Sequence, residues 1–77
     1  MRDILKYLIT SIVDKPEAVE ILEEENQGIV NLTVKVDPQD MGKVIGKEGK
    51  VIRALRNVLR IPAVLQDKKI YINLSEN

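Results

Sequence analysis

Two glycines three residues apart, Gly46 and Gly49, separate two stretches of apolar helical periodicity and enclose only two charged residues. A turn this short between two helices leaves little room for side chains, and Gly46 can adopt a positive φ that other residues resist. Gly49 lets another backbone approach the start of the following helix, where unpaired N–H groups favour an anion. The pattern predicts a helix–turn–helix corner with a potential phosphate site, although an isolated glycine pair more often only permits the corner.

The composition limits how such a corner can be stabilised. The chain has 77 residues, no cysteine and no histidine, and 44% of its residues are hydrophobic. A chain of this length buries about 60% of its unfolded surface, so we expect one domain over residues 1–77. Without cysteine or histidine the chain lacks disulfides, thiolate ligands, the usual general base and the commonest metal ligand. We therefore expect an aliphatic core, no catalytic residue, no metal site and no cofactor.

Apolar periodicity predicts the elements of the N-terminal half. Helical spacing predicts a first helix from about Asp3, a suitable N-cap, to Asp14. Alternating apolar residues over 19–21 and 30–36 predict two strands. The acidic, glycine-terminated run over 23–28 predicts the turn between them and reads as a solvated hairpin end. This half is thus expected to be a helix followed by an antiparallel hairpin.

The C-terminal half is expected to hold two helices and a strand. Asp37 is a suitable cap and Pro38 a suitable first helical residue, so a short helix should run from Pro38 to the glycine pair. A second helix should begin at about Lys50 and end at Pro62. Alternation over 69–74 predicts a third strand. The order αββααβ indicates an α+β domain in which a three-stranded sheet packs against three helices.

Charge is unevenly distributed along the chain although the net charge is zero. Residues 1–40 carry 4 basic and 9 acidic side chains, a net charge of −5, whereas residues 41–77 carry 8 basic and 3 acidic, a net charge of +5. A basic segment can bind a polyanion locally, while the acidic half limits indiscriminate binding. We take Arg60 as an ordinary solvated helix position and Arg56 as a residue that could instead face a partner.

The sequence shows no feature of a secreted or membrane-inserted chain. No apolar run near the N-terminus is followed by a small-residue cleavage site, and no stretch approaches the ~20 apolar residues of a membrane span. The lack of cysteine agrees with a reducing compartment. We therefore expect a soluble, cytoplasmic protein with no membrane partner.

The segment VIGKEGKVI, residues 44–52, resembles the core motif of KH domains, in which a GxxG loop clamps about four nucleotides. The αββααβ order is that of the type II, bacterial form of this fold, and over nearly its whole length the chain resembles the small KhpA (YlqC-like) family. The resemblance implies a cytoplasmic single-stranded RNA-binding protein acting as an RNA chaperone or post-transcriptional regulator. It also implies a homodimer and a larger KhpB/Jag/EloR-type partner, linked in some bacteria to cell elongation, cell shape and peptidoglycan homeostasis.

The same resemblance assigns roles to individual residues. The loop would hold the RNA backbone, two isoleucines would line an apolar groove for unstacked bases, and three flanking basic residues would add phosphate contacts. The outer edge of the second strand near Val34 and Val36 would form the other wall. Glu48 departs from what phosphate binding favours, because a carboxylate repels phosphate. The implied RNA-binding residues are Lys43, Ile45, Gly46, Lys47, Glu48, Gly49, Lys50, Ile52 and Arg53.

Other functions stay open at this stage. One is a protein-interaction module that uses the same fold with little RNA affinity, with the helix over 50–60 as a dimer face. Another is DNA binding, since a KH groove accepts either nucleic acid. Tyr71 is the only aromatic residue after the first helix, which argues against an aromatic stacking platform and favours an apolar-groove mode. One such module binds weakly, so dimerisation would add avidity.

Overall fold

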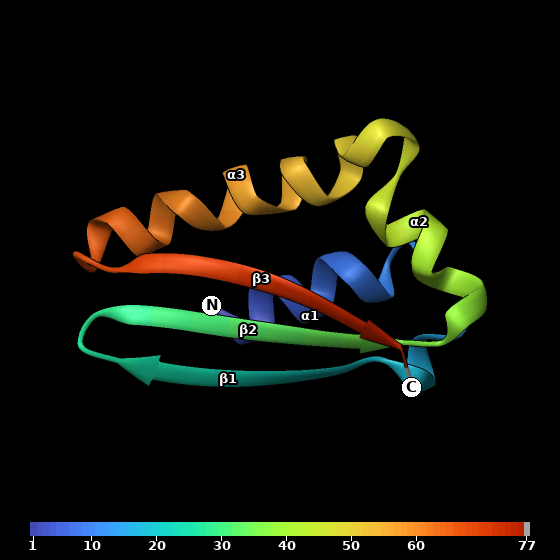
Figure 1. The fold of residues 1–77 in the computed structure, drawn as a ribbon, viewed down its shortest axis with the longest axis horizontal. Helices are drawn as coiled ribbons and strands as arrows, with labels where there is room; N and C mark the ends of the chain where they lie inside the picture. The colour runs from blue at the N-terminus through green and yellow to red at the C-terminus, as the bar shows by residue number, and fades with distance from the viewer. Residues whose placement is uncertain (77) are drawn as a thin grey trace.

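The computed structural model describes residues 1–76 and has the predicted element order (Figure 1). Asn77, the last residue of the predicted domain, lies outside the described residues. The α+β class and the αββααβ order are confirmed, with short 3-10 turns added between the main elements. The elements are α1 (Arg2–Thr10), η1 (Pro16–Ala18), β1 (Glu20–Asn26), β2 (Ile29–Val36), η2 (Pro38–Asp40), α2 (Met41–Ile45), η3 (Lys47–Gly49), α3 (Lys50–Leu65) and β3 (Lys69–Glu76).

The sheet has the order β1-β2-β3, so β2 is its central strand. β1 and β2 are antiparallel, with Ile21 opposite Val34, whereas β2 and β3 are parallel, with Val34 opposite Leu74. A parallel pair cannot be joined by a tight turn, and the connection here runs through α2, the glycine pair and α3. This crossover places β3 as the strand nearest α3 (Figure 1).

The core lies between the helices and one face of the sheet. Alternate residues of β2 are buried and the intervening ones are partly exposed, so the helices cover a single face. Burying a Val, Leu or Ile side chain stabilises the fold by about 1.5–3 kcal/mol, and aliphatic residues supply this core as expected. Its fully buried members are Leu5, Ile9, Val30, Leu32, Val34, Val36, Val44 and Leu59.

The first helix is shorter than predicted. Its N-cap is Met1 rather than Asp3, and it ends at Thr10 rather than Asp14. The reason lies far along the chain, because the backbone N–H groups of Asp14 and the following residue donate to the carboxylate of Asp40. These amides therefore leave the helical hydrogen-bond pattern and direct the chain toward β1.

The acidic run predicted as a turn is part of β1. Glu23–Glu25 continue the strand, and the turn itself is only Gln27 and Gly28, with φ of 52° and 79°. Two consecutive positive φ angles match the twist of a two-residue hairpin. The prediction was wrong because β1 is an edge strand on which exposed glutamates are tolerated, and Glu25 pairs with Lys68 at 2.8 Å.

The last helix passes through Pro62 instead of ending there and continues to Leu65. It is closed by a C-terminal cap in which the N–H of Lys68 donates to the carbonyl of Ala63, while Asp67 has φ of 56°. This position is usually glycine, so an aspartate gave no stop signal in the sequence. Within residues 1–76 none of the helices is long and apolar enough to span a membrane.

Candidate nucleic-acid interface

Gly46 ends α2 with φ of 78° and ψ of 170°, a backbone region that is essentially restricted to glycine. A Cβ atom placed on Gly46 would lie 2.4 Å from Cγ2 and 2.7 Å from the backbone nitrogen of Val51. Both the conformation and the available space therefore require glycine. The positive φ predicted for Gly46 is confirmed, and the close contact packs the end of α2 against the first turn of α3.

Gly49 plays a different part in the same loop. It has φ of 74° and follows Glu48, which has φ of 58°, so two consecutive residues are left-handed. A Cβ on Gly49 would meet only ordinary contacts, 3.9 Å from Cγ2 of Ile52 and 4.0 Å from Nη2 of Arg53. Backbone conformation, rather than close packing within this chain, explains the glycine. The space beside it is open to a ligand.

Hydrogen bonds hold the loop while leaving donors at the start of α3. The N–H of Gly49 donates to the carbonyl of Gly46 at 3.1 Å, and Nη2 of Arg53 donates to the carbonyl of Glu48 at 3.2 Å. Gly49 is the N-cap of α3 and has no side chain with which to cap the first turn. The N–H of Lys50 donates to the carbonyl of Lys47. The partial positive charge of the turn that follows still favours an anion.

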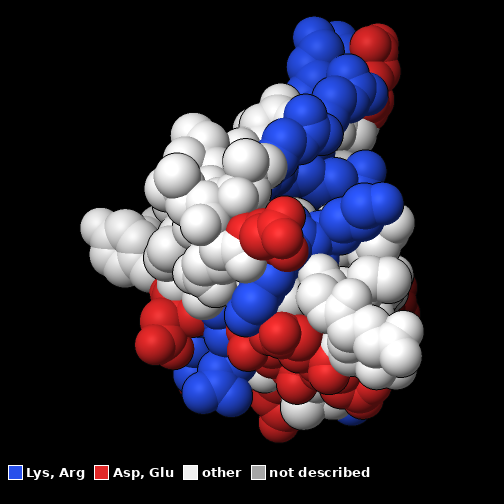
Figure 2. Space-filling model, turned by 90° about the vertical axis from the view of Figure 1, so that its left-hand side faces the viewer, with Lys and Arg blue, Asp and Glu red and all other residues white. Residues whose placement is uncertain are grey.

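A band of Lys and Arg side chains extends from this loop along α3. Figure 2, viewed from the end at which α3 terminates, shows the band rising across the molecule. Most Asp and Glu side chains in this view lie below the band, and others lie against its middle and its upper end. Spacings of three and four residues align such side chains on one helix face. Apart from the bond from Arg53 to the loop, no ion pair or side-chain hydrogen bond among residues 1–76 occupies the band. Its exposed members are Lys47, Lys50, Arg53, Arg56 and Arg60.

Comparison with known proteins agrees with this geometry. A family model described as "KhpA/KhpB, KH domain" matches residues 2–74. This chain belongs to that family. It is 38% identical over 74 residues to the RNA-binding protein KhpA of Clostridium perfringens, covering 96% of this chain and 99% of the relative. It is 36% identical over 77 residues to the RNA-binding protein KhpA of Chlamydia caviae, and the match covers 100% of this chain and 99% of that relative.

Membership in this family relates both the observed fold and the position of the loop to the KH domain. Three helices and a mixed three-stranded sheet in αββααβ order are consistent with a type II KH domain. The loop over 46–49 then has the position of the KH GxxG loop between two helices. The relatives named above are described as RNA-binding proteins.

The other residues assigned by resemblance to the KH site differ in accessibility. Lys43 forms an ion pair with Asp14, so part of its charge is already neutralised within the chain. Ile45 is 37% exposed at the end of α2, whereas Ile52 is 9% exposed and belongs to the core. Of these residues, Ile45 therefore offers the more accessible apolar surface, and Lys43 is a less free cation than Lys47.

The predicted second wall of the KH groove is wrong as stated. β2 lies between two other strands and has no outer edge, and its residues Val34 and Val36 are fully buried. The sheet edge beside α3 belongs to β3. An edge strand presents backbone N–H and C=O groups without strand partners, so the β3 edge is where polar contacts to a strand-like ligand are available.

Asp40 is the residue at this end of the domain whose role the sequence did not reveal. By sequence position Asp40 lies in the first turn of the helix expected from Pro38, where negative charge is favoured. In the structure it is only 1% exposed, and its carboxylate accepts from the N–H groups of Asp14 at 3.1 Å and Lys15 at 2.9 Å. The bond from Asp14 is the largest influence holding the pKa of Asp40 below its ordinary value of 3.8; burial opposes the shift, while the Lys15 amide and the Lys43 charge add to it. Asp40 thereby fixes the start of α2 to the α1–β1 connection. Within residues 1–76 no group of carboxylates could hold a metal ion.

We expect Asp40→Asn to lower the free energy of unfolding at neutral pH, because an amide has one oxygen for two N–H donors and no charge. A carboxylate whose folded pKa is depressed stabilises the fold above its ordinary pKa, and this contribution is lost as the pH falls through the folded pKa. Urea unfolding midpoints of wild type and variant should therefore differ at pH 7 and converge well below pH 3.8. Glu24→Gln on exposed β1 is the control. A midpoint difference that persists unchanged in acid contradicts this role.

Proposed function

We propose that this chain binds single-stranded RNA, with the RNA backbone on the Gly46–Gly49 loop. The observation that carries the proposal is a glycine-dependent loop that exposes the uncapped start of α3 next to the free ammonium groups of Lys47 and Lys50. Phosphate is the anion that such a combination of N–H donors and cations favours. The names of the relatives as RNA-binding proteins support RNA as the source of that phosphate.

The remaining site residues fit subordinate roles in this proposal. Ile45 supplies exposed apolar surface for an unstacked base, and Ile52 supports it from the core. Arg53 both braces the loop and contributes charge, while Lys43 adds a weaker phosphate contact because Asp14 pairs with it. Glu48 is exposed, so its carboxylate can turn toward solvent. A groove of this kind holds about four nucleotides, which predicts modest affinity for a single domain.

In the cell we propose an RNA chaperone or post-transcriptional role in the cytoplasm. The family resemblance is the ground for also proposing a heteromer with a KhpB/Jag/EloR-type partner. The resemblance also links such a pair to cell elongation and peptidoglycan homeostasis. A weakly binding, fast-releasing domain suits repeated contact with many RNAs better than tight retention of one.

Fluorescence anisotropy with a labelled, degenerate single-stranded RNA tests the function directly. We expect binding that weakens with salt, with a slope of log K against log salt of about −0.7 for each phosphate contacted. A double-stranded RNA of the same length is the control, since its bases are not free to enter a groove. Absence of salt-dependent binding, or equal affinity for both RNAs, contradicts the proposal.

A second candidate function, self-association, is favoured by one specific observation. An apolar groove of about 370 Å³ lies between α1 and α3 and is lined by side chains that include Leu8, Ile12 and Val58. Beyond it along α3, Ile61 and Leu65 are 66% and 82% exposed. Contiguous exposed apolar surface of this kind marks protein interaction sites. Lys50, a member of the basic band, also lines this groove, so a homodimer through this surface would border the band while Arg53, Arg56 and Arg60 stay outside the groove, and it would add avidity for RNA.

We expect the wild-type chain to sediment as a dimer and Val58→Lys to sediment as a monomer. The added charge would be buried against apolar side chains in the dimer, while lysine is well tolerated in an exposed helix of the monomer. Asn57→Lys adds the same charge at the neighbouring exposed position, so it should remain dimeric. Analytical ultracentrifugation above the concentrations used for RNA binding gives the answer, and a monomeric wild type rules out the homodimer.

A further inference from the structure

We propose that RNA held on the loop continues along α3 to a second subsite at the far end of that helix, where Arg60 and Lys69 bind phosphate and Tyr71 stacks a base. This inference rests on the proposed RNA binding. It changes the interpretation of two residues, since the sequence placed Arg60 as an ordinary solvated position and Tyr71 as an isolated aromatic residue.

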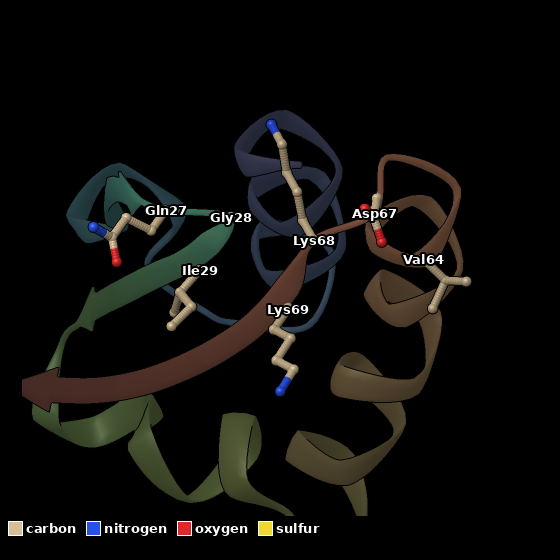
Figure 3. A pocket seen from close by; sticks show the side chains of 7 residues that line it. All are labelled: Gln27, Gly28, Ile29, Val64, Asp67, Lys68 and Lys69. Carbon is tan, nitrogen blue, oxygen red and sulfur yellow. The ribbon is translucent and has the colours of Figure 1, made fainter.

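The subsite is a surface pocket of about 260 Å³ between the end of α3 and the start of β3. A second pocket of about 370 Å³ adjoins it and shares Val64, Lys68 and Lys69, continuing toward the β1–β2 turn (Figure 3). The hollow therefore extends around the end of the domain opposite the loop. In the first pocket α3 contributes Arg60, Ala63 and Val64, and β3 contributes Lys69, Ile70 and Tyr71.

The cations of this pocket are available to a ligand. Arg60 and Lys69 are exposed, and within residues 1–76 neither side chain has an ion pair or a side-chain hydrogen bond. Lys68, the residue before β3, differs because it pairs with Glu25 at 2.8 Å and its side chain points in the opposite direction to that of Lys69 (Figure 3). The one acid among the described lining residues, Asp67, belongs only to the adjoining pocket. Two unpaired positive charges thus border the hollow.

Tyr71 adds an aromatic surface to the pocket, which the binding of an inorganic anion alone would not require. It is 51% exposed, although the next residue along β3, Ile72, is 5% exposed and packs into the core. Period-two alternation places Tyr71 on the same side of the strand as Lys69. A half-exposed ring beside two cations is the combination that single-stranded nucleic acid uses, with phosphates on the charges and a base on the ring. Such stacking is worth roughly tenfold in affinity and is tolerant of base identity.

The basic band connects this pocket to the loop. Ten residues of helix from Lys50 to Arg60 span about 15 Å, a distance that roughly four stacked nucleotides cover. Arg53 and Arg56 lie between them at helical spacing, so exposed charge accompanies the whole path (Figure 2). An RNA longer than the four nucleotides held by the loop can therefore reach Tyr71 without leaving the basic surface.

The test compares a four-nucleotide and a ten-nucleotide degenerate RNA on wild type and on Lys69→Thr, Tyr71→Thr, by fluorescence anisotropy. Threonine suits an exposed edge strand, so the fold should persist. We expect the variant to bind the short RNA as wild type does and to bind the long RNA about tenfold or more weakly. Lys6→Ala, Tyr7→Ala removes the same side-chain types from exposed positions on α1 and should bind both RNAs normally.

The other outcomes each overturn the inference and separate it from the proposed function. If wild type and variant bind the long RNA with equal affinity, the second subsite does not bind RNA, and the loop remains the proposed RNA site. An equal loss on both RNAs places Lys69 and Tyr71 in the four-nucleotide groove itself. If the wild type binds neither RNA, the proposed function fails and the subsite fails with it.

Discussion

Replacing Gly46 with alanine is expected to destabilise the chain strongly, whereas the same change at Gly42 should leave it equally or slightly more stable. A methyl group on residue 46 would clash with Val51, whose backbone nitrogen would lie only 2.7 Å away. The alanine would also have to adopt φ of 78°. Backbone strain of this kind alone costs about 1–3 kcal/mol. A Cβ on Gly42 meets nothing within 4 Å and lies inside α2, where alanine is favoured over glycine by about 0.5–1 kcal/mol.

Urea unfolding followed by circular dichroism measures both effects in the same buffer. We expect the two variants to differ by about 3 kcal/mol in the free energy of unfolding, with wild type nearer to Gly42→Ala. Because both variants add one methyl group, added hydrophobicity cannot account for the difference, and helix propensity at Gly42 accounts for only about 0.5–1 kcal/mol of it. Equal unfolding midpoints for the two variants would show that the loop relaxes around the added methyl group at position 46. The close contact with Val51 would then not contribute to stability.

The double change Lys47→Asp, Glu48→Asp is expected to abolish RNA binding while the fold remains intact. Lys47 is exposed and makes no ion pair among the described residues, so replacing it breaks no ion pair within the chain. Glu48 has φ of 58°, and aspartate adopts left-handed φ more readily than glutamate. The substitution removes one phosphate contact, which should lower the slope of log K against log salt by about 0.7 in magnitude. It also adds a carboxylate that repels phosphate.

Lys6→Asp is the matched control for this loop variant, since it reverses an equally exposed charge on α1. It should retain most of the RNA affinity, because exposed charges more than about 10 Å from the RNA are screened at ordinary ionic strength. A loop variant that binds RNA as well as wild type would show that the backbone contacts lie elsewhere. Equal losses in both variants would show that net charge, rather than the loop, governs binding.

The parts of the fold that local sequence determines could be predicted. Alternating residues along β2 and the apolar stripe of α3 are periodic signals, and Asp37 caps the next turn as expected by accepting from the N–H of Gln39. The positive φ at Gly46 followed from its place between two helical patterns. These features depend on residues within a few positions of one another, which is why sequence alone sufficed for them.

The errors arose where distant residues decide the structure. Asp40 bonds to amides 25 and 26 residues away, and no local pattern marks that contact. The position of β2 between two strands depends on β3 pairing in parallel with it, so the wall near Val34 was misplaced although the strand itself was predicted. Similarly, the ion pair between Lys43 and Asp14 joins residues 29 positions apart, so the sequence does not indicate that this cation is partly neutralised.

The parallel pairing of β2 with β3 has a consequence for when the domain becomes functional during synthesis. The loop, α2 and α3 all precede β3 in the chain, yet the edge beside α3 exists only after Lys69–Glu76 have joined the sheet. Synthesis proceeds from the N-terminus, and non-local parallel contacts form late in folding. A nascent chain in which β3 has not yet paired with β2 therefore carries the glycine loop without the sheet edge beside α3.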